Sequence, residues 1–375
     1  MLQIGINGRS LFRQSTGVQQ YSREITRHLL EIKPDDVSIS VFAGREGRGK
    51  EQDLPLETSA FPANSPLRGI VWEQALLKRM AVKAGIDVLF NPANVAPLSP
   101  PVPSAVTIHD LTFLLFPQYF SRPFAFYYRA LIPRVAAQAR ILITDSDNTK
   151  QDLVNELNLP AEKIRVVPLG VSRHFRRRVT KKEMEVIRRR HNLPPHFFLS
   201  ISSLEPRKNL RRLVEAYRLL PPAVTEEYAL VLAGTGNRIF AEPGLTEAIA
   251  RLETDSVTVT GYIPTEDLPA VYRMSTALAF PSLYEGFGLP VLEAMAASTP
   301  VITSNRSSLP EVAGHAAVLI DPESTEEIAA AMELIATDSG TRTLLAERGK
   351  KRAALFTWEK AANKTLEILR EAAEA

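Results

Sequence analysis

Short apolar runs alternate with amphipathic helical patterns along almost the whole chain. Strands are expected at Leu2–Asn7, Val37–Phe42, Val88–Asn91, Ala105–His109, Ile141–Thr144, Ile164–Pro168, Phe197–Ser203, Tyr228–Ala233, Val257–Thr260, Ala277–Phe280, Val301–Thr303 and Ala317–Ile320. Helices are expected at Val18–Leu30, Ile70–Ala84, Pro123–Ala137, Thr149–Glu156, Leu210–Leu220, Leu245–Leu252, Leu268–Met274, Leu289–Ala297 and Thr325–Ala336. Apolar strands that are joined through helices run parallel and are buried on both faces. The pattern therefore predicts an α/β fold of parallel sheets with helices on both faces.

The length of the chain predicts two domains. Its 375 residues exceed what one ordinary hydrophobic core supports. The alternation restarts after a highly charged segment, Arg173–His191, which Pro194 and Pro195 close. We interpret this segment as a linker and place the domain boundary near residue 172. Ligands of open α/β sheets bind outside the carboxyl ends of the strands, so two such domains facing each other would form a cleft.

Composition narrows the class of protein. There is no run of about 18 apolar residues, the length that a membrane-spanning helix needs. The N-terminal residues Met1–Asn7 are strand-like and lack the basic and apolar segments of a signal peptide. The chain has no cysteine, so disulfides and thiolate metal sites are excluded. A net charge of +3 is too small to imply nucleic-acid binding. We expect a cytoplasmic protein.

One expected helix, Ile70–Ala84, combines basic and apolar residues. It carries Lys78, Arg79 and Lys83 together with an apolar side formed by Trp72, Leu76, Leu77 and Met80. A helix of this kind can lie on an anionic membrane surface, and the protein would then be peripheral at the inner face of the membrane. The alternative is a solvated helix whose apolar side packs on its own core.

Two glutamates bracket a glycine-containing turn after the expected strand Ala277–Phe280. Glu285 stands in the turn with Gly286 and Gly288, and Glu293 lies about one turn into the following helix. The amides of a loop at a helix N-terminus favour an anion such as phosphate. An ionised carboxylate only accepts hydrogen bonds, so it selects hydroxyl groups. Phosphate-binding amides between two hydroxyl-binding carboxylates suit a nucleotide sugar.

A basic pair follows another expected strand. Arg207 and Lys208 come after Phe197–Ser203 and precede a helix. Arg can fork onto two phosphate oxygens, and Lys acts as a point charge. The alternative is an exposed basic loop in which Asn209 caps the helix.

Two glycines stand where a ligand could approach the backbone. Gly234 ends a strand in the sequence Gly-Thr-Gly, which lacks the third glycine of a dinucleotide-binding fingerprint. Gly17 ends an N-terminal turn before a helix, and it can equally be a simple helix start.

A histidine and an aspartate pair also follow strands. His109 stands at a strand end, where it could donate to a sugar oxygen or occupy a structural position. Asp145 and Asp147 could hold a divalent cation against a diphosphate. However, Asp147 also begins an expected helix, where Ser, Asp and Thr are ordinary capping residues.

Together these residues resemble the retaining glycosyltransferases of family 4, which have two facing Rossmann-like domains (the GT-B fold). The resemblance covers nearly the whole chain, and its most specific part is the E-x7-E motif of Glu285 and Glu293. Supporting segments are Arg207-Lys208-Asn209, His109-Asp110, Val167 to Val171 and Phe356 to Glu359. The usual paired glycine near Gly17 is replaced by Ser15 or Thr16. The resemblance implies an acceptor-side domain at residues 1–172, a nucleotide-sugar domain at 173–356, and a helix at 357–375 that returns to the first domain.

The resemblance also implies roles for the candidate residues. Arg207 and Lys208 would hold the donor diphosphate, Glu293 the ribose, and Glu285 a hydroxyl of the transferred sugar. His109 would lie beside the sugar's reaction face. The remaining donor-binding candidates are backbone groups of Gly17, Gly234, Gly286, Phe287, Gly288 and Leu289. Such enzymes usually need no metal, so no cofactor is expected.

The opening Ile6 to Phe12 and the Glu205-Pro206-Arg207 variant are most similar to bacterial mannosyl- and rhamnosyltransferases of surface polysaccharide assembly. The expected reaction is therefore transfer of a hexose, with mannose favoured, from a donor such as GDP-mannose to a glycan or lipid-linked acceptor. The alternatives are a UDP-glucose-type glucosyltransferase, a nucleotide-sugar epimerase on the same fold, and two non-enzymes, a catalytically dead scaffold and a nucleic-acid-binding protein.

Overall fold

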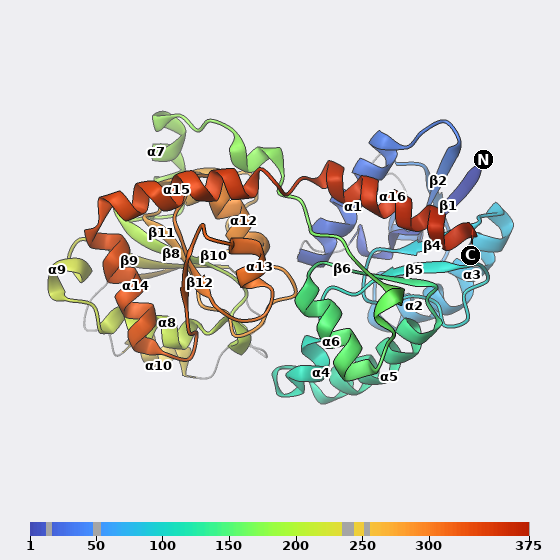
Figure 1. Cartoon of the computed structure of the whole chain (residues 1–375), viewed down its shortest axis with the longest axis horizontal. Coiled ribbons are helices and arrows are strands. Elements are labelled where there is room, and N and C mark those ends of the chain that lie inside the picture. The colour runs from blue at the N-terminus through green and yellow to red at the C-terminus, as the bar shows by residue number, and fades with distance from the viewer. Residues whose placement is uncertain (13–16, 48–53, 235–243, 251–255, 375) are drawn as a thin grey trace. The chain divides into compact units, whose positions relative to one another are not determined.

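The computed structural model describes residues 1–12, 17–47, 54–234, 244–250 and 256–374, and it divides into two compact units. The first unit comprises Met1–Pro117, Ser121–Gly170 and Thr357–Ala375. The second comprises Val171–Phe356 together with Gln118–Phe120. The chain therefore passes into the second unit after Gly170 and returns to the first at Thr357 (Figure 1).

A seven-stranded sheet forms the centre of the first unit, in the order β3-β2-β1-β4-β5-β6-β7, and all neighbouring strands are parallel. The strands are β1 (Leu2–Asn7), β2 (Val37–Ala43), β3 (Leu56–Thr58), β4 (Val88–Asn91), β5 (Ser104–Thr107), β6 (Ile141–Thr144) and β7 (Ile164–Val166). Every residue of β4, β5 and β6 is buried, as expected for strands covered on both faces. The order of the strands reverses between β1 and β4, so the ends of these two strands lie side by side.

The helices of the first unit come from both ends of the chain. They are α1 (Gly17–Ile32), α2 (Pro66–Val71), α3 (Leu77–Ala84), α4 (Thr112–Leu115), α5 (Arg122–Gln138), α6 (Asp147–Leu157) and α16 (Trp358–Glu374). Helix α16 packs along α1 and reaches β4 and β5 (Figure 1). The buried Trp358 ring lies 6.0 Å from the ring of Tyr21. The last helix is therefore part of the core of the first unit.

The helix expected at Ile70–Ala84 is interrupted. A π-helical turn, η3 (Trp72–Leu76), separates α2 from α3. Trp72 and Leu77 are fully buried in a core cluster, against which Leu76 and Met80 pack. The apolar side of this segment therefore packs on the unit's own core, which is the alternative given above. Among the described residues, no helix is both long and apolar enough to cross a bilayer.

The second unit is built on a six-stranded parallel sheet in the order β10-β9-β8-β11-β12-β13. Its strands are β8 (Phe197–Ile201), β9 (Ala229–Ala233), β10 (Val257–Gly261), β11 (Ala277–Phe280), β12 (Val301–Ser304) and β13 (Val318–Ile320). The order reverses between β8 and β11, which are neighbours. The carboxyl ends of these two central strands therefore meet.

Helices cover both faces of this second sheet. They are α7 (Lys181–Arg190), α8 (Leu210–Arg218), α9 (Pro222–Thr225), α10 (Leu245–Ala250), α11 (Leu268–Met274), α12 (Leu289–Ala296), α13 (Leu309–Ala313), α14 (Thr325–Thr337) and α15 (Ser339–Ala353). Phe198 and Leu230 join a core cluster with α8, α10 and α14. Their neighbours Leu199 and Val231 point to the opposite face and are equally buried.

The sequence suggested that the charged segment Arg173–His191 is a linker, but the structure shows a helix in it. Residues Lys181–Arg190 form α7, and the side chain of Thr180 caps its start by accepting from the N–H of Glu183. Helix α7 packs on α11 through the buried Ile187. This helix was not predicted, because most of its residues are charged and only one large apolar residue, Ile187, is buried.

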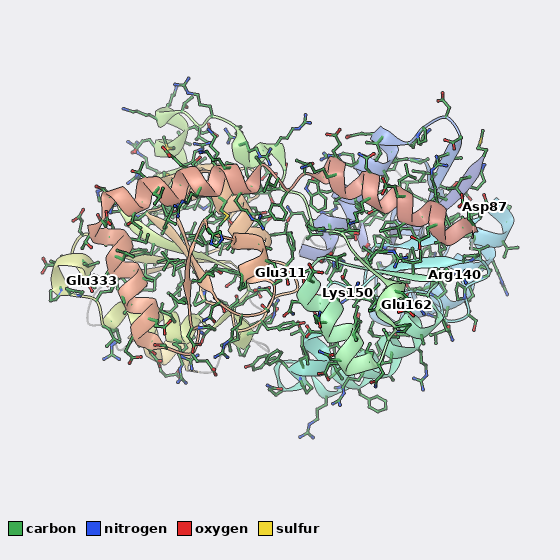
Figure 2. The ribbon with its side chains drawn as sticks, in the orientation of Figure 1. Asp87, Arg140, Lys150, Glu162, Glu311 and Glu333 are labelled. Carbon is green, nitrogen blue, oxygen red and sulfur yellow. The ribbon has the colours of Figure 1, made fainter. Side chains whose placement is uncertain are left out.

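The predicted pair of parallel α/β domains is confirmed. Strands β1, β4, β6 and β11 have the predicted bounds, and the short edge strand β3 was not predicted. Charged side chains such as Arg140 and Glu333 are exposed on the outside of the units (Figure 2). In each unit, the point at which the strand order reverses carries polar residues among the site candidates.

Candidate functional site

The candidate residues of the second unit gather where its strand order reverses. Arg207 and Lys208 belong to a 3-10 turn, η7 (Pro206–Lys208), that follows β8. Glu285 stands in the loop between β11 and α12. Since β8 and β11 are neighbouring parallel strands, both loops emerge at the same edge of the sheet. Ligands of open α/β sheets bind at such an edge.

Glu285 holds both cations. One carboxylate oxygen of Glu285 accepts a hydrogen bond from Lys208 Nζ, and the other accepts from the Arg207 guanidinium at 2.8 Å. Arg207 also donates to Glu205 at 2.8 Å and to the carbonyl of Tyr284 at 3.3 Å. The alternative of an exposed basic loop is wrong, because Lys208 is only 9% exposed. Its ammonium lies 5.3 Å from the centre of the Phe280 ring.

The charges of this cluster stabilise one another. Burial alone would raise the pKa of Glu285, but Lys208 and Arg207 outweigh it and lower that pKa to about 2. Burial, together with the neighbouring Arg207, lowers the pKa of Lys208 despite the attraction of Glu285. Glu285 is therefore an anion at every physiological pH, and it neutralises the buried ammonium of Lys208.

The turn after Glu285 is fixed by glycine and serine. Gly288 has a φ of +116°, and an added Cβ would lie 2.7 Å from the Leu309 side chain. The Ser308 hydroxyl donates to the carbonyls of Glu285 and Phe287, both at 2.8 Å. Helix α12 then begins at Leu289 with no side-chain cap. Pro290 has no N–H, and the N–H groups of Val291 and Leu292 donate to the carbonyl of Gly288 at 3.0 and 3.4 Å, so the N–H that the start of α12 can offer an anion is that of Leu289.

Glu293 lies inside α12 and is buried. The Tyr272 hydroxyl donates to its carboxylate at 3.0 Å. Burial and the carboxylate both raise the pKa of Tyr272, so that phenol remains a neutral donor. Glu293 therefore accepts a hydrogen bond from within the protein in this structure.

Gly234 permits a close approach between two strand ends. Its φ is +136°, and an added Cβ would lie 1.9 Å from the carbonyl oxygen of Ser202, after β8. The N–H of Gly234 donates to the carbonyl of Gly261 at 2.8 Å. The rest of the Gly-Thr-Gly turn, including Gly236, lies outside the described residues.

The candidate histidine lies in the first unit, where it pairs with an aspartate. Nδ1 of His109 lies 2.7 Å from the carboxylate of Asp145, and Nε2 lies 3.2 Å from the carbonyl of Pro92. Both neighbours are acceptors and a neutral imidazole has only one N–H, so this arrangement suits the imidazolium. Burial would lower the pKa of His109, but Asp145 outweighs it and raises the pKa.

Asp145 and Asp147, which the sequence offered as a possible cation site, have other positions and contacts in the structure. Asp145 binds His109, whereas Asp147 is the first residue of α6, which Ser146 caps by accepting from the N–H of Thr149 at 3.1 Å. Across the part of the chain that the structure describes, no three His, Asp or Glu side chains are grouped so that they could hold a metal ion. The alternative of a capping role is confirmed for Ser146.

Gly17 begins α1, and the four residues before it lie outside the described ranges. Nothing lies within 4 Å of a Cβ added at this position, so packing does not require glycine there.

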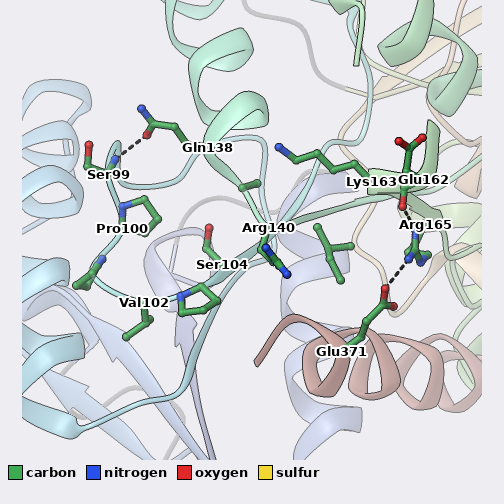
Figure 3. A pocket seen from close by; sticks show the side chains of 14 residues that line it. Ser99, Pro100, Val102, Ser104, Gln138, Arg140, Glu162, Lys163, Arg165 and Glu371 are labelled. Carbon is green, nitrogen blue, oxygen red and sulfur yellow. Dashed lines mark hydrogen bonds and ion pairs between the residues drawn. The ribbon is translucent and has the colours of Figure 1, made fainter. Parts of the chain in front are cut away.

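Two hollows among the described residues lie in the first unit. An open hollow of about 940 Å³ lies at the amino ends of β5, β6 and β7, between Ser99, Arg140, Lys163 and Glu371 (Figure 3). Arg165 and Glu371 form an ion pair across it. It occupies the sheet edge opposite to the carboxyl ends, where ligands of such sheets do not bind. A smaller cavity of about 230 Å³ lies at the carboxyl ends of β1 and β4.

Sequence reasoning missed several partners of the candidate residues. Tyr272, Ser308 and Asn94, whose side chain accepts from the N–H of His109 at 2.8 Å, were not identified. The pairing of His109 with Asp145 had a signal, because both follow neighbouring strands. The others come from distant segments, and their contacts depend on details of packing.

Two family models match the chain. Residues 15–175 match the model described as Glycosyltransferase Family 4, and residues 183–352 match Glycosyl transferases group 1.

Several curated relatives are named as mannosyltransferases. O-antigen chain mannosyltransferase B of Escherichia coli is 32% identical over 264 residues, which are 70% of this chain and 69% of that protein. O-antigen chain mannosyltransferase RfbU of Salmonella typhimurium is 26% identical over 85% of this chain and 86% of its own length. The serotype-specific mannosyltransferase WbdA of E. coli is 30% identical over 61% of the chain, which spans only 28% of that longer protein.

Solved structures share the fold at low identity. Anabaena Alr3699/HepE in complex with UDP and glucose has a TM-score of 0.76 at 19% identity, with 99% of this chain and 100% of that chain covered. WaaG, a glycosyltransferase involved in lipopolysaccharide biosynthesis, has a TM-score of 0.70 at 16% identity, with 98% and 99% covered.

Proposed function

We propose that this chain, which belongs to the family 4 glycosyltransferases, transfers mannose from GDP-mannose to a glycan or lipid-linked acceptor during polysaccharide synthesis, with retention of the anomeric configuration. Support for the sugar comes from relatives named as mannosyltransferases of O-antigen chains. The UDP-bound structural neighbour makes a UDP-sugar the second candidate donor.

The observation that carries the proposal is the cluster of Arg207, Lys208 and Glu285 at the point where the second sheet reverses. Two cations beside a helix N-terminus suit a diphosphate, and a carboxylate between them suits an adjacent sugar hydroxyl. Lys208 has three hydrogens to donate, and Glu285 accepts one of them. The ammonium can therefore bind a phosphate oxygen as well.

The chemistry follows from where charge develops. Glycosyl transfer proceeds through an oxocarbenium-like transition state while negative charge builds on the departing diphosphate. Arg207 and Lys208 would stabilise that charge. When these two cations bind diphosphate oxygens, Glu285 would accept a hydrogen bond from a hydroxyl of the sugar instead. The acceptor would attack on the same face from which the phosphate leaves, with a phosphate oxygen taking its proton.

The other candidate residues complete the donor site in this proposal. Glu293 would accept from the ribose hydroxyls, and the backbone at Phe287, Gly288 and Leu289 would bind the sugar or its phosphate. His109 would present positive charge beside the sugar. No metal is needed in this scheme, because protein cations neutralise the diphosphate.

The proposal also includes contact with a membrane, through a different side of α2 and α3 from the one that the sequence suggested. The outer side of α2 and α3 exposes Leu67, Val71 and Val82 together with Arg79 and Lys83. This surface, rather than the Trp72 side, would lie on anionic lipid near a lipid-linked acceptor. Sedimentation with vesicles containing anionic lipid would test it. Equal sedimentation of the wild type and a Val71→Ser, Val82→Ser variant would remove this part of the proposal.

Nucleotide preference gives the first test. A ligand that binds only the native state raises stability with the logarithm of its concentration over Kd. We expect GDP and GDP-mannose to raise the melting temperature more than UDP, ADP or their sugar conjugates. If UDP-glucose raises the melting temperature most, GDP-mannose is not the donor, but transfer of a sugar from a nucleotide sugar remains the proposed reaction.

Lys208→Ala tests the diphosphate role. We expect kcat/KM to fall at least about a hundredfold, or roughly 2.7 kcal/mol of transition-state stabilisation. The matched control is Lys78→Ala, which removes a lysine from the α3 surface of the other unit. A fall of less than about threefold for Lys208→Ala would place the diphosphate elsewhere.

A further inference from the structure

Ser307 has an unusual backbone conformation. Its φ is +52°, in the left-handed region where glycine and asparagine are the usual residues. It lies in the turn between β12 and α13, at the carboxyl edge of the second sheet. A serine stays in this region only when its surroundings hold it there, and such strain gathers at functional sites. The contacts of its side chain indicate what this conformation serves.

The hydroxyl of Ser307 holds the backbone of Glu285. The N–H of Glu285 donates to Ser307 Oγ at 3.0 Å. The hydroxyl of the next residue, Ser308, lies 2.8 Å from the carbonyl oxygens of Glu285 and Phe287. Two consecutive serines therefore bind both peptide groups of Glu285, one on each side of its Cα. The direction in which the Glu285 side chain leaves the backbone is fixed by these contacts.

The loop after β11, which carries Glu285, is also held on its other side. The N–H of Leu283 donates to the carbonyl of Arg207 at 2.8 Å, and Asn209 Nδ2 donates to the carbonyl of Pro281 at 3.1 Å. Strand β11 pairs with β8 and with β12, so this loop lies between the residues that follow those two strands. The residues after β8 hold it on one side, and Ser307 holds it on the β12 side.

The loop that carries Ser307 has anchors of its own. The N–H of Asn305 donates to the carbonyl of Ile320, the last residue of β13, at 2.8 Å. The N–H of Arg306 donates to Ser304 Oγ at 3.1 Å. Ser307 therefore connects the Glu285 loop to a turn that is itself fixed to the sheet.

These backbone contacts matter most when a donor is bound. In the proposed reaction, Arg207 and Lys208 bind diphosphate oxygens, and Glu285 accepts from a hydroxyl of the sugar. The ion pairs that now orient the carboxylate are weakened at that stage. The hydrogen bonds to Ser307 and Ser308 do not involve the carboxylate, so they can persist and keep Glu285 in place.

We propose that Ser307 is a positioning residue, which fixes the direction from which Glu285 meets the transferred sugar by holding the N–H of Glu285. Glycine would suit the left-handed backbone better, but it has no hydroxyl to accept this N–H. The strain at Ser307 is therefore retained for the hydrogen bond. The inference rests on the proposed glycosyl transfer, because it assigns a residue that serves Glu285 in that reaction.

Two substitutions of Ser307 separate the hydroxyl from the strain. Ser307→Ala removes the hydroxyl and keeps a Cβ at positive φ, whereas Ser307→Gly removes the hydroxyl and relieves the backbone. Ser307→Gly should melt about 2–4 °C above Ser307→Ala. Both should slow the release of GDP from GDP-mannose, with methyl α-mannoside as acceptor, at least about fivefold, the factor that one ordinary hydrogen bond is worth. Both should bind GDP as the wild type does, because the two cations are retained.

Thr180→Ala is the matched control. The Thr180 hydroxyl also accepts a backbone N–H, that of Glu183 at 3.2 Å, but it caps α7. Loss of this cap should lower stability, and GDP release should keep the wild-type rate. The proposal is overturned if either Ser307 variant releases GDP at the wild-type rate, if only the less stable Ser307→Ala is slow, or if Thr180→Ala is equally slow. In each of these cases Ser307 serves stability alone.

Hydrogen exchange separates this inference from the proposed function. The amide of Glu285 should exchange at least about fivefold faster in both Ser307 variants than in the wild type or Thr180→Ala, because it loses its acceptor. Unchanged exchange would refute the contact whatever the rates of GDP release. If GDP does not raise the melting temperature of the wild type, the donor proposal fails, and faster exchange still supports the hold of Ser307 on Glu285. If GDP stabilises the wild type but the variants keep the wild-type rate and exchange, this inference fails and the donor proposal stands.

Discussion

Removing the charge of Glu285 is the sharpest test of the donor cluster. Glu285→Gln keeps the shape of the side chain but leaves Arg207 and Lys208 without the carboxylate that now binds both. Truncating one member of a buried ion pair costs about 3–5 kcal/mol, because the remaining charge has no partner. The variant should therefore be less stable, because Lys208 loses its carboxylate partner while Arg207 keeps only Glu205.

The magnitude follows from the pKa. A fall from the ordinary 4.5 to about 2 in the folded state corresponds to about 3 kcal/mol of stability at neutral pH, since a change of one in pKa is worth about 1.4 kcal/mol. Because the folded pKa is the lower one, this stabilisation is present above pH 4.5. It is lost as the pH falls from about 5 to about 2.

Urea unfolding at several pH values provides the assay. Both tryptophans, Trp72 and Trp358, lie in the first unit, so their fluorescence follows that unit, whereas hydrogen exchange in β8 and β11 follows the second. We expect Glu285→Gln to lower the stability of the second unit by about 3 kcal/mol at pH 7. The difference from the wild type should vanish near pH 2, where the wild-type carboxyl also becomes protonated.

Glu205→Gln is the matched control. Glu205 also binds Arg207, but its side chain is 32% exposed, so its loss should change stability by less than about 1 kcal/mol. The reasoning is refuted if Glu285→Gln loses less than about 1 kcal/mol or if its loss does not depend on pH. GDP should bind the variant at least as tightly as the wild type, because the anion meets less negative charge, while sugar transfer should fall.

Three further outcomes are expected. Glu293→Gln should weaken donor binding in calorimetry, and unchanged affinity would leave Glu293 as a partner of Tyr272 alone. Gly234→Ala should destabilise the second unit by about 3 kcal/mol or more, because its Cβ would collide with the Ser202 carbonyl at a positive φ, whereas Gly17→Ala should melt within a few degrees of the wild type. EDTA should leave the transfer rate unchanged, and loss of activity that Mn²⁺ restores would overturn the metal-free scheme.

Much of the fold could be predicted because the buried parallel strands are mostly apolar. Four strands were predicted with their observed bounds for this reason. Helices α7 and α15 were not predicted, since neither carries a broad apolar stripe. Helix α7 buries only Ile187, and α15 packs largely through small residues, with Gly349 against Met295.

The sequence predicted which residues belong to the candidate site, but it did not predict the contacts between their side chains. Arg207, Lys208 and Glu285 follow neighbouring strands, and the structure brings them together. The sequence could not reveal that Glu285 neutralises both cations, because carboxylate orientation depends on side-chain packing. It also could not reveal that both ring nitrogens of His109 face acceptors within the protein. The sequence of η3, which includes Glu73, has the pattern of an ordinary helix, so the π-helical turn could not be predicted.

The helix α16 has a consequence for how the chain is made. A ribosome releases the strands of the first unit early, but Trp358 and the rest of α16 emerge only after the whole of the second unit. Domains usually fold in the order in which they are synthesised. Here the part of α1 that packs on α16, including the contact of Tyr21 with Trp358, lacks its partner until α16 has been made. The unit that begins first is therefore completed last, and in the interval it is the part of the nascent polypeptide most in need of a chaperone.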